Sequence, residues 1–168
     1  MAETDRPYRA GCSISGIDAE RVFAALLDVE SFPEWAVGLG AVRATDLQGR
    51  ETQVVTPGTR LTFVLRAAGL SHTVVSEITA VEPPRLLEWR YVKGATGVGG
   101  WHVQETGPNT VEMALATDYT VQPAWLNRIA HRPFFRGLTE DLLRRSIRRF
   151  EERLRRAAGI RPQAAENG

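Results

Sequence analysis

The order of the predicted elements indicates an α+β domain, in which a curved antiparallel sheet of six or seven strands wraps around a long C-terminal helix. Two observations carry this prediction. Segments of alternating apolar and polar residues follow one another through turn-rich connections that are too short for the crossovers of a parallel sheet. An amphipathic stretch then closes the chain, and its apolar stripe requires a partner, which the apolar face of the sheet can supply.

The N-terminal part is expected to form a strand over residues 8–15 and then a helix over residues 18–29. Asp18 is a suitable N-cap for this helix. Apolar residues then recur at helical spacing, namely Val22, Phe23, Leu26 and Leu27. Pro33 interrupts the pattern, so we expect a second, short helical turn around residues 32–35.

Six further strands are expected, at residues 41–47, 58–69, 71–81, 85–94, 99–107 and 110–121. Their boundaries carry Gly, Pro or Asn, which favour turns. The glycine-rich run 94–100 is expected to be a flexible hairpin at the rim of the domain. It is not expected to bind phosphate, because it lies between two strands and lacks the lysine of a P-loop.

Alternation within these strands predicts one strongly apolar and aromatic face. That face would carry Leu61, Phe63, Leu65, Leu87, Trp89, Tyr91, Val111, Met113, Leu115, Thr117 and Tyr119. Arg66 alternates with these residues and is expected to face outward. Only one of the neighbours Trp101 and His102 can face inward in a regular strand, and the sequence leaves open which one.

The final helix is expected over residues 138–156, and Gly159 and Pro162 end it. We expect residues 1–160 to form a single domain and residues 161–168 to form a disordered tail. A sheet of six or seven strands is wider than one helix. The remaining concave space is therefore either filled by side chains or hollow.

Composition excludes several classes of function. The formal net charge of +1 gives no electrostatic reason to expect binding to nucleic acid or to an acidic membrane. With no signal peptide, no apolar run long enough to cross a bilayer and only Cys12 as a cysteine, a cytoplasmic protein is expected. The histidines His72, His102 and His131 lack ligand spacing, so neither a metal nor another cofactor is expected.

Four segments resemble the START/Bet v 1-like (SRPBCC) superfamily with its helix-grip fold and, within it, the bacterial polyketide cyclase/dehydrase family. They are IDAERVFAALLDVESFPEW, PGTRLTFVL, EPPRLLEWR and the amphipathic final helix. The resemblance extends over about residues 8–156. It implies that the interrupted helix closes the mouth of a deep cavity, where Phe32, Pro33 and Trp35 would line or gate the opening. The alternative is that Phe32 and Trp35 only fasten the helical break to the sheet.

A cavity lined by aromatic side chains with a few polar tips suits a flat, apolar molecule that carries oxygen atoms. The expected ligand-binding residues are Phe32, Trp35, Phe63, Leu65, Trp89, Tyr91, Trp101, Met113, Leu115, Tyr119, Leu142 and Ser146. Candidates for proton transfer or hydrogen bonding to a reacting oxygen are Tyr91, His102 and Tyr119. Related aromatase/cyclases use a pocket arginine as well, and the outward register of Arg66 leaves that role unassigned.

Three functions remain open at this point. The first is capture of an apolar, aromatic or polyketide-like metabolite without chemistry, since some family members protect producing bacteria by capturing reactive enediyne compounds. The second is a polyketide aromatase/cyclase or dehydrase. The third is a protein-interaction module like the co-chaperone members of the superfamily. The expected partner is a hydrophobic small molecule, and the expected state is a monomer or a weak homodimer.

Overall fold

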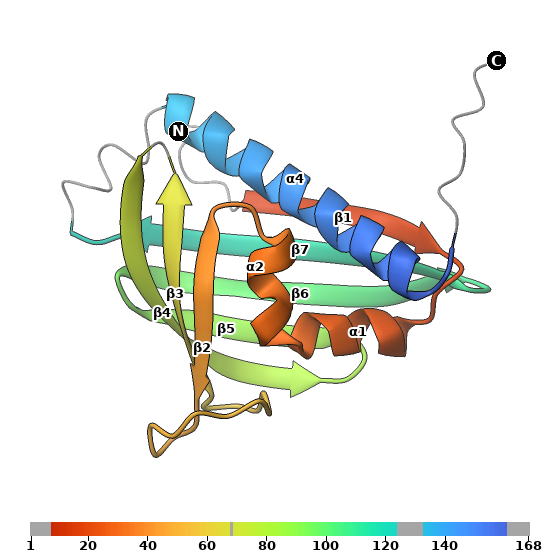
Figure 1. Ribbon diagram of the computed structural model, residues 1–168, viewed down its shortest axis with the longest axis horizontal. Helices are drawn as coiled ribbons and strands as arrows, with labels where there is room; N and C mark the ends of the chain where they lie inside the picture. The colour runs from red at the N-terminus through yellow and green to blue at the C-terminus, as the bar shows by residue number, and fades with distance from the viewer. Residues whose placement is uncertain (1–7, 68, 124–132, 161–168) are drawn as a thin grey trace.

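The computed structural model of this chain describes residues 8–67, 69–123 and 133–160 (Figure 1). Its strands are β1 (Tyr8–Ser15), β2 (Leu39–Thr45), β3 (Arg60–Ala67), β4 (Leu70–Glu82), β5 (Leu86–Lys93), β6 (Ala95–Gly107) and β7 (Thr110–Val121). Its helices are α1 (Ala19–Leu27), η1 (Val29–Ser31), α2 (Phe32–Trp35) and α4 (Pro133–Ala157). The predicted tail and His131 lie outside the described residues.

One antiparallel sheet contains all seven strands, in the order β1-β7-β6-β5-β4-β3-β2. Register shifts bend it: one lies in β2 between Leu39 and Val42, and two lie where β4 pairs with β5. Such irregularities increase local twist and bend a strand. The sheet therefore curves around α4, which crosses its concave face (Figure 1). This architecture confirms the predicted helix-grip fold class.

The helical segment between β1 and β2 forms for local reasons. The Asp18 side chain accepts a hydrogen bond from the Arg21 backbone N–H at 2.8 Å and so caps α1. Pro33 lies in the first turn of α2, where its missing N–H costs no helical hydrogen bond. Phe32–Trp35 is therefore a separate helical turn, as the sequence predicts.

Helix α4 packs differently along its length. Towards its C-terminus Ile147, Phe150 and Leu154 are buried in the hydrophobic core with residues of α1, β6 and β7. Nearer its N-terminus Leu142 and Leu143 are only partly buried. No helix in the described ranges is both long and apolar enough to span a bilayer. The solid core therefore lies under one half of α4, and the other half crosses less densely filled space.

The prediction of a flexible hairpin at residues 94–100 is wrong. β6 begins at Ala95 and pairs regularly with β5 and with β7, so only Gly94 lies between β5 and β6. Gly94 has a φ of 77°, a value that glycine adopts at little cost. Two long flanking strands pair with this segment, and their hydrogen bonds override the low strand propensity of its glycines.

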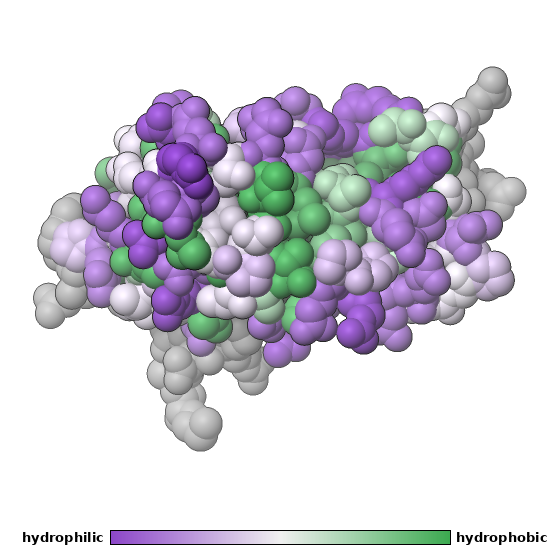
Figure 2. All heavy atoms as spheres, turned by 90° about the horizontal axis from the view of Figure 1, so that it is seen from below, coloured by the Kyte–Doolittle hydropathy of each residue, from purple (hydrophilic) through white to green (hydrophobic). Residues whose placement is uncertain are grey.

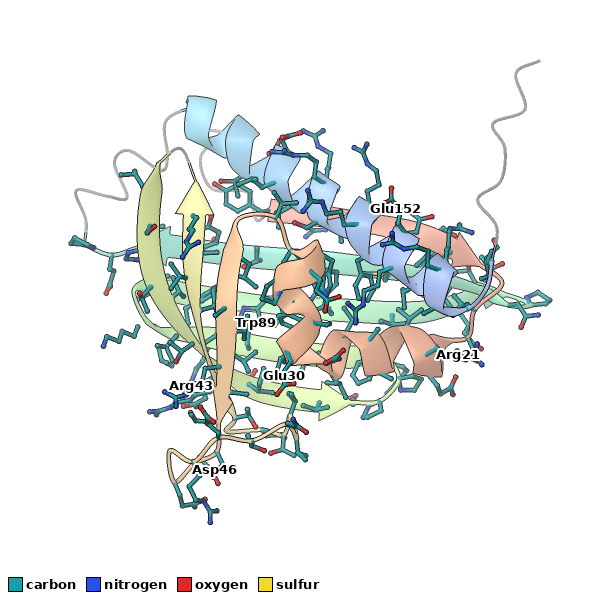
Figure 3. All side chains as sticks on the ribbon, viewed as in Figure 1. Arg21, Glu30, Arg43, Asp46, Trp89 and Glu152 are labelled. Atoms are coloured by element: carbon teal, nitrogen blue, oxygen red, sulfur yellow. The ribbon has the colours of Figure 1, made fainter. Side chains whose placement is uncertain are left out.

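Charged and apolar side chains separate as the fold requires. Four of the five labelled charged residues, Arg21, Arg43, Asp46 and Glu152, lie around the outside, whereas Trp89 lies over the middle of the sheet (Figure 3). The surface seen from below is mostly hydrophilic, but an apolar area interrupts it near the middle (Figure 2).

Candidate functional site

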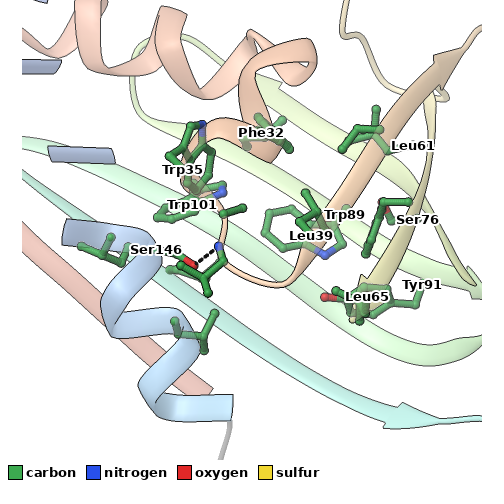
Figure 4. A pocket seen from close by; sticks show the side chains of 18 of the residues that line it. Phe32, Trp35, Leu39, Leu61, Leu65, Ser76, Trp89, Tyr91, Trp101 and Ser146 are labelled. Atoms are coloured by element: carbon green, nitrogen blue, oxygen red, sulfur yellow. Dashed lines mark hydrogen bonds between the residues drawn. The ribbon is translucent and has the colours of Figure 1, made fainter. Parts of the chain in front are cut away.

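The concave face of the sheet encloses a cavity beneath the N-terminal half of α4 and the loop after α2 (Figure 4). The cavity has two chambers, with volumes of about 190 Å³ and about 210 Å³. Trp89, Leu115, Leu143 and Ser146 are among the residues that line both, so the two chambers adjoin. We call the first the apolar chamber and the second the polar chamber, after the side chains described below.

Eleven of the twelve residues that the sequence suggested as ligand contacts line this cavity. Phe32, Trp35 and Trp101 line the apolar chamber alone, and Tyr119 and Leu142 line the polar chamber alone. Both chambers share Phe63, Leu65, Trp89, Tyr91, Leu115 and Ser146. The exception is Met113, which is 2% exposed and belongs to the solid core. It lies on the predicted face but beyond the point where the hollow ends.

The apolar chamber ends in a cluster of aromatic rings around Trp35. This indole lies edge-on to Phe32, Phe150 and Trp101, with ring centroids 5.1, 4.8 and 6.2 Å away. Trp35 is 4% exposed, and its N–H has no hydrogen-bond partner among the described residues. Phe32 is only partly buried. Trp35 therefore fastens α2 to the core and also forms a chamber wall, so both roles considered for it apply.

Two glycines shape the wall that β6 contributes. Gly97 lies opposite Tyr91, and Gly99 lies opposite Trp89. A Cβ atom on Gly99 would be only 2.4 Å from Cζ2 of Trp89, so the indole lies directly against the backbone. A Cβ atom on Gly97 would be 2.1 Å from the Asp118 carbonyl oxygen. The glycine-rich run thus allows aromatic rings to lie across β6 beside the hollow.

The polar chamber contains a group of phenols. Tyr119 lies between Tyr8 and Tyr91, with ring centroids 5.4 and 5.8 Å away. The Tyr91 hydroxyl is 3.0 Å from the Thr117 hydroxyl. Burial raises the pKa of the Tyr91 phenol, and hydrogen bonding with Thr117 and Trp89 offsets part of the rise. Burial, with smaller effects of Tyr8 and Tyr91, likewise raises the pKa of Tyr119.

His72 also reaches this chamber. Its Nε2 atom lies 2.6 Å from the carbonyl oxygen of Gly94. His72 was not among the expected ligand contacts, although the alternation of β4 places it on the concave side. Counting back in steps of two from the buried Ile78 passes Ser76 and Val74 and reaches His72, and all four line the cavity.

His102 faces away from the cavity. It is exposed, whereas its neighbours Trp101 and Val103 are buried on the concave side. Burying the large indole determines the register, so we withdraw His102 as an acid or base in the cavity. Arg66 is exposed as predicted, yet it also lines the edge of the polar chamber. Its guanidinium forms no ion pair with the described residues.

Ser146 joins the loop after α2 to α4. Its hydroxyl accepts a hydrogen bond from the Val37 N–H at 2.8 Å and donates one to the Leu142 carbonyl at 2.7 Å (Figure 4). Arg153, further along the same helix, forms ion pairs with Asp28 and Glu34. Three polar contacts therefore hold residues 28–37 against α4. The described residues contain no group of His, Cys, Asp and Glu that could hold a metal ion.

The chain matches a known family over most of its length. Residues 13–159 match the family described as polyketide cyclase / dehydrase and lipid transport. The chain belongs to this family. The resemblance noted in the sequence is thereby confirmed. A comparison with the curated proteins finds no significant match.

Solved structures share the fold at low sequence identity. A protein from Thermus thermophilus has a TM-score of 0.73 and 17% identity, over 90% of this chain and 98% of that chain. The ZhuI aromatase/cyclase from Streptomyces sp. R1128 has a TM-score of 0.71 and 15% identity, over 97% and 98%. A START superfamily protein from Mycobacterium smegmatis has a TM-score of 0.59 and 13% identity, over 90% and 99%. At these identities the likeness establishes the fold.

Proposed function

We propose that this protein binds a hydrophobic small molecule, aromatic or of the polyketide type, in the cavity under α4. Its role would lie in natural-product biosynthesis or self-resistance, through sequestration of a reactive metabolite such as an enediyne. The observation that carries this proposal is the pair of adjoining chambers, one apolar and aromatic and the other lined by phenol, hydroxyl and imidazole groups. Such a lining suits fused rings with oxygen substituents at one end.

The dimensions of the cavity support a ligand of more than one ring. A cavity of about 150 Å³ in a protein core is large enough to bind benzene. Each chamber here exceeds that volume, at about 190 and about 210 Å³. A bicyclic or tricyclic compound would therefore extend through both chambers, with one end against Trp101 and the other beside Tyr91.

A second candidate is the aromatase/cyclase or dehydrase activity. His72 favours it, because this imidazole lines the same chamber as Tyr91 and Tyr119. Neutral His72 would remove a proton from a methylene between two ketones. The carbanion would attack a second carbonyl carbon of the folded chain, and the resulting alkoxide would regain the proton. The cavity would contribute mainly by holding the two carbons in contact.

The protein-interaction module is the least favoured function. Its surface would need to recognise a partner from outside, whereas the aromatic side chains singled out here face the enclosed space under α4. A module without a small ligand would also gain nothing from the volume left unfilled, since unfilled core space lowers stability.

The first test is titration with a panel of aromatic polyketides and an enediyne analogue, followed by tryptophan fluorescence and amide NMR. Saturable quenching with shifts at residues 32–37 supports the proposal. The variant Ser76→Leu fills the apolar chamber from its buried wall and should weaken binding about tenfold or more. Thr73→Leu adds the same side chain to the opposite face of the same strand and should leave binding unchanged. Absence of any response would contradict both small-molecule functions.

Mass spectrometry of the bound compound separates binding from catalysis. Recovery of the compound unchanged after prolonged incubation supports sequestration. A cyclised or dehydrated product that forms with the wild-type protein, but not with His72→Gln, supports the enzyme instead.

A further inference from the structure

We infer that the polar chamber selects a ligand end that donates hydrogen bonds, such as a phenolic or enolic hydroxyl, over one that only accepts them, such as an ether. The inference rests on the proposed function and specifies the chemistry of the ligand at one end of the same cavity. It follows from the direction of the hydrogen bonds that the chamber already contains.

The first step concerns the proton of Tyr91. Thr117 lies 3.3 Å from the Val98 carbonyl oxygen, which can only accept, so the Thr117 hydroxyl donates its one proton there. The contact of 3.0 Å between Tyr91 and Thr117 then has one direction, in which the Tyr91 hydroxyl donates and the Thr117 oxygen accepts. The phenolic proton is thus already engaged, and the Trp89 indole N–H donates to the same oxygen, so Tyr91 offers a ligand only its remaining lone pair.

The second step concerns the tautomer of His72. The Gly94 carbonyl also can only accept, so the Nε2 atom of His72, 2.6 Å away, carries a proton. The same carbonyl accepts the Gln122 N–H at 3.0 Å, which fixes its position. In the neutral ring Nδ1 then carries a lone pair, and it makes no hydrogen bond within the described part of the chain. His72 therefore presents a second acceptor.

The remaining polar groups do not reverse this preference. The Tyr119 hydroxyl forms a hydrogen bond with the Thr139 side chain. The five N–H groups of Arg66 are donors, but this side chain is exposed at the edge of the chamber, where water solvates it. At Tyr91 and His72, acceptors face the ligand. A ligand ether placed there would face lone pairs, whereas a ligand hydroxyl would donate to one of them.

The test compares 2-naphthol, 2-methoxynaphthalene and naphthalene by isothermal titration calorimetry at neutral pH. The three probes share one ring system and differ in whether they donate a hydrogen bond, only accept one or do neither. For the wild-type protein we expect 2-naphthol to bind about tenfold more tightly than its methyl ether. His72→Phe removes the Nδ1 lone pair and supplies no other acceptor, while the Gly94 carbonyl keeps the Gln122 N–H, so it should reduce this preference.

Thr117→Val gives the sharpest result. It removes the acceptor that holds the Tyr91 proton, and Tyr91 can then donate to the methyl ether. The preference for 2-naphthol should fall at least about fivefold, while Thr117→Ser, which keeps the hydroxyl, should retain it. Unchanged affinity for naphthalene in both variants shows that the cavity is intact.

The outcomes separate the inference from the proposed function. Equal binding of all three probes to the wild-type protein, or equal preferences in the Thr117→Val and Thr117→Ser variants, overturns the inference and leaves the proposed function standing. Failure of every probe to bind, together with failure of the polyketide panel, overturns the proposed function and this inference with it.

Discussion

The indole of Trp89 lies directly on the backbone of Gly99, its partner on the neighbouring strand. A methyl group at Gly99 would displace this ring, because its Cβ would be 2.4 Å from Cζ2 and the sheet behind it cannot move. The ring would turn into the space that both chambers share. We therefore predict that Gly99→Ala lowers the affinity for aromatic ligands about tenfold and changes the tryptophan emission spectrum.

The matched control is Gly107→Ala. A Cβ atom on Gly107 has no neighbour within 4 Å, and this residue ends the same strand. It should leave both affinity and emission unchanged. Wild-type affinity in the Gly99→Ala protein would show that the indole does not border the bound ligand.

Ser146→Ala should loosen the segment over the cavity mouth. The substitution leaves the Val37 N–H without its acceptor, and an unpaired buried donor costs about 1–3 kcal/mol. We expect a decrease of that size in the free energy of unfolding and faster hydrogen exchange at the Val37 amide. Ser71→Ala, at an exposed position in β4, should change neither quantity. Unaltered exchange at Val37 would show that the hydroxyl does not hold the loop.

Stability should decrease as the pH rises above about 10. An unfolded phenol ionises near pH 10, whereas burial raises the pKa of Tyr91 and Tyr119 in the folded protein. The folded state thus binds more protons than the unfolded state in this range, and each further pH unit lowers the free energy of unfolding. Thermal unfolding between about pH 8 and about pH 11 measures the slope.

A variant with both Tyr91→Phe and Tyr119→Phe should show a shallower dependence on pH. The residual slope should come partly from Cys12, whose raised pKa has the same sign. An identical slope in the variant and the wild-type protein would assign the alkaline sensitivity to other groups.

Cys12 should react slowly with thiol reagents in the folded protein. Burial raises the pKa of its thiol to about 12, and the nearby Glu151 carboxylate adds to the rise. Only the thiolate reacts, so almost none is available at about pH 8. Labelling with iodoacetamide should be slow without urea and fast in urea. Its rate in the Ser146→Ala protein should increase only if that substitution promotes unfolding of β1.

Strand alternation predicted which residues face inward but not how far along each strand the hollow extends. Leu61, Phe63 and Leu65 were placed correctly on the concave side, because that choice depends on their own strand alone. Met113 shares a face with Tyr119 but lies under the densely packed half of α4. The position at which a helix crosses a sheet depends on the whole fold, so local alternation cannot supply it.

The histidines illustrate a second limit. The sequence left Trp101 and His102 as alternatives, and the free energy of burying an indole decided between them. His72 was not expected to line the cavity, although the alternation of β4 places it inward. The glycines of residues 94–100 were interpreted through their intrinsic flexibility. Pairing on both sides instead makes them part of a regular strand.

The unequal packing along α4 bears on how such a domain could change its ligand. Phe150 and Leu154 are buried in the hydrophobic core at one end of α4, whereas Leu142 and Leu143 border the cavity at the other end. Leu142 and Leu143 are only partly buried, so substitutions there should cost less folding free energy than substitutions at the first pair. One helix thus separates the residues that preserve the fold from those that can vary. A scaffold of this kind can acquire a new specificity through single substitutions without first needing a stabilising change elsewhere.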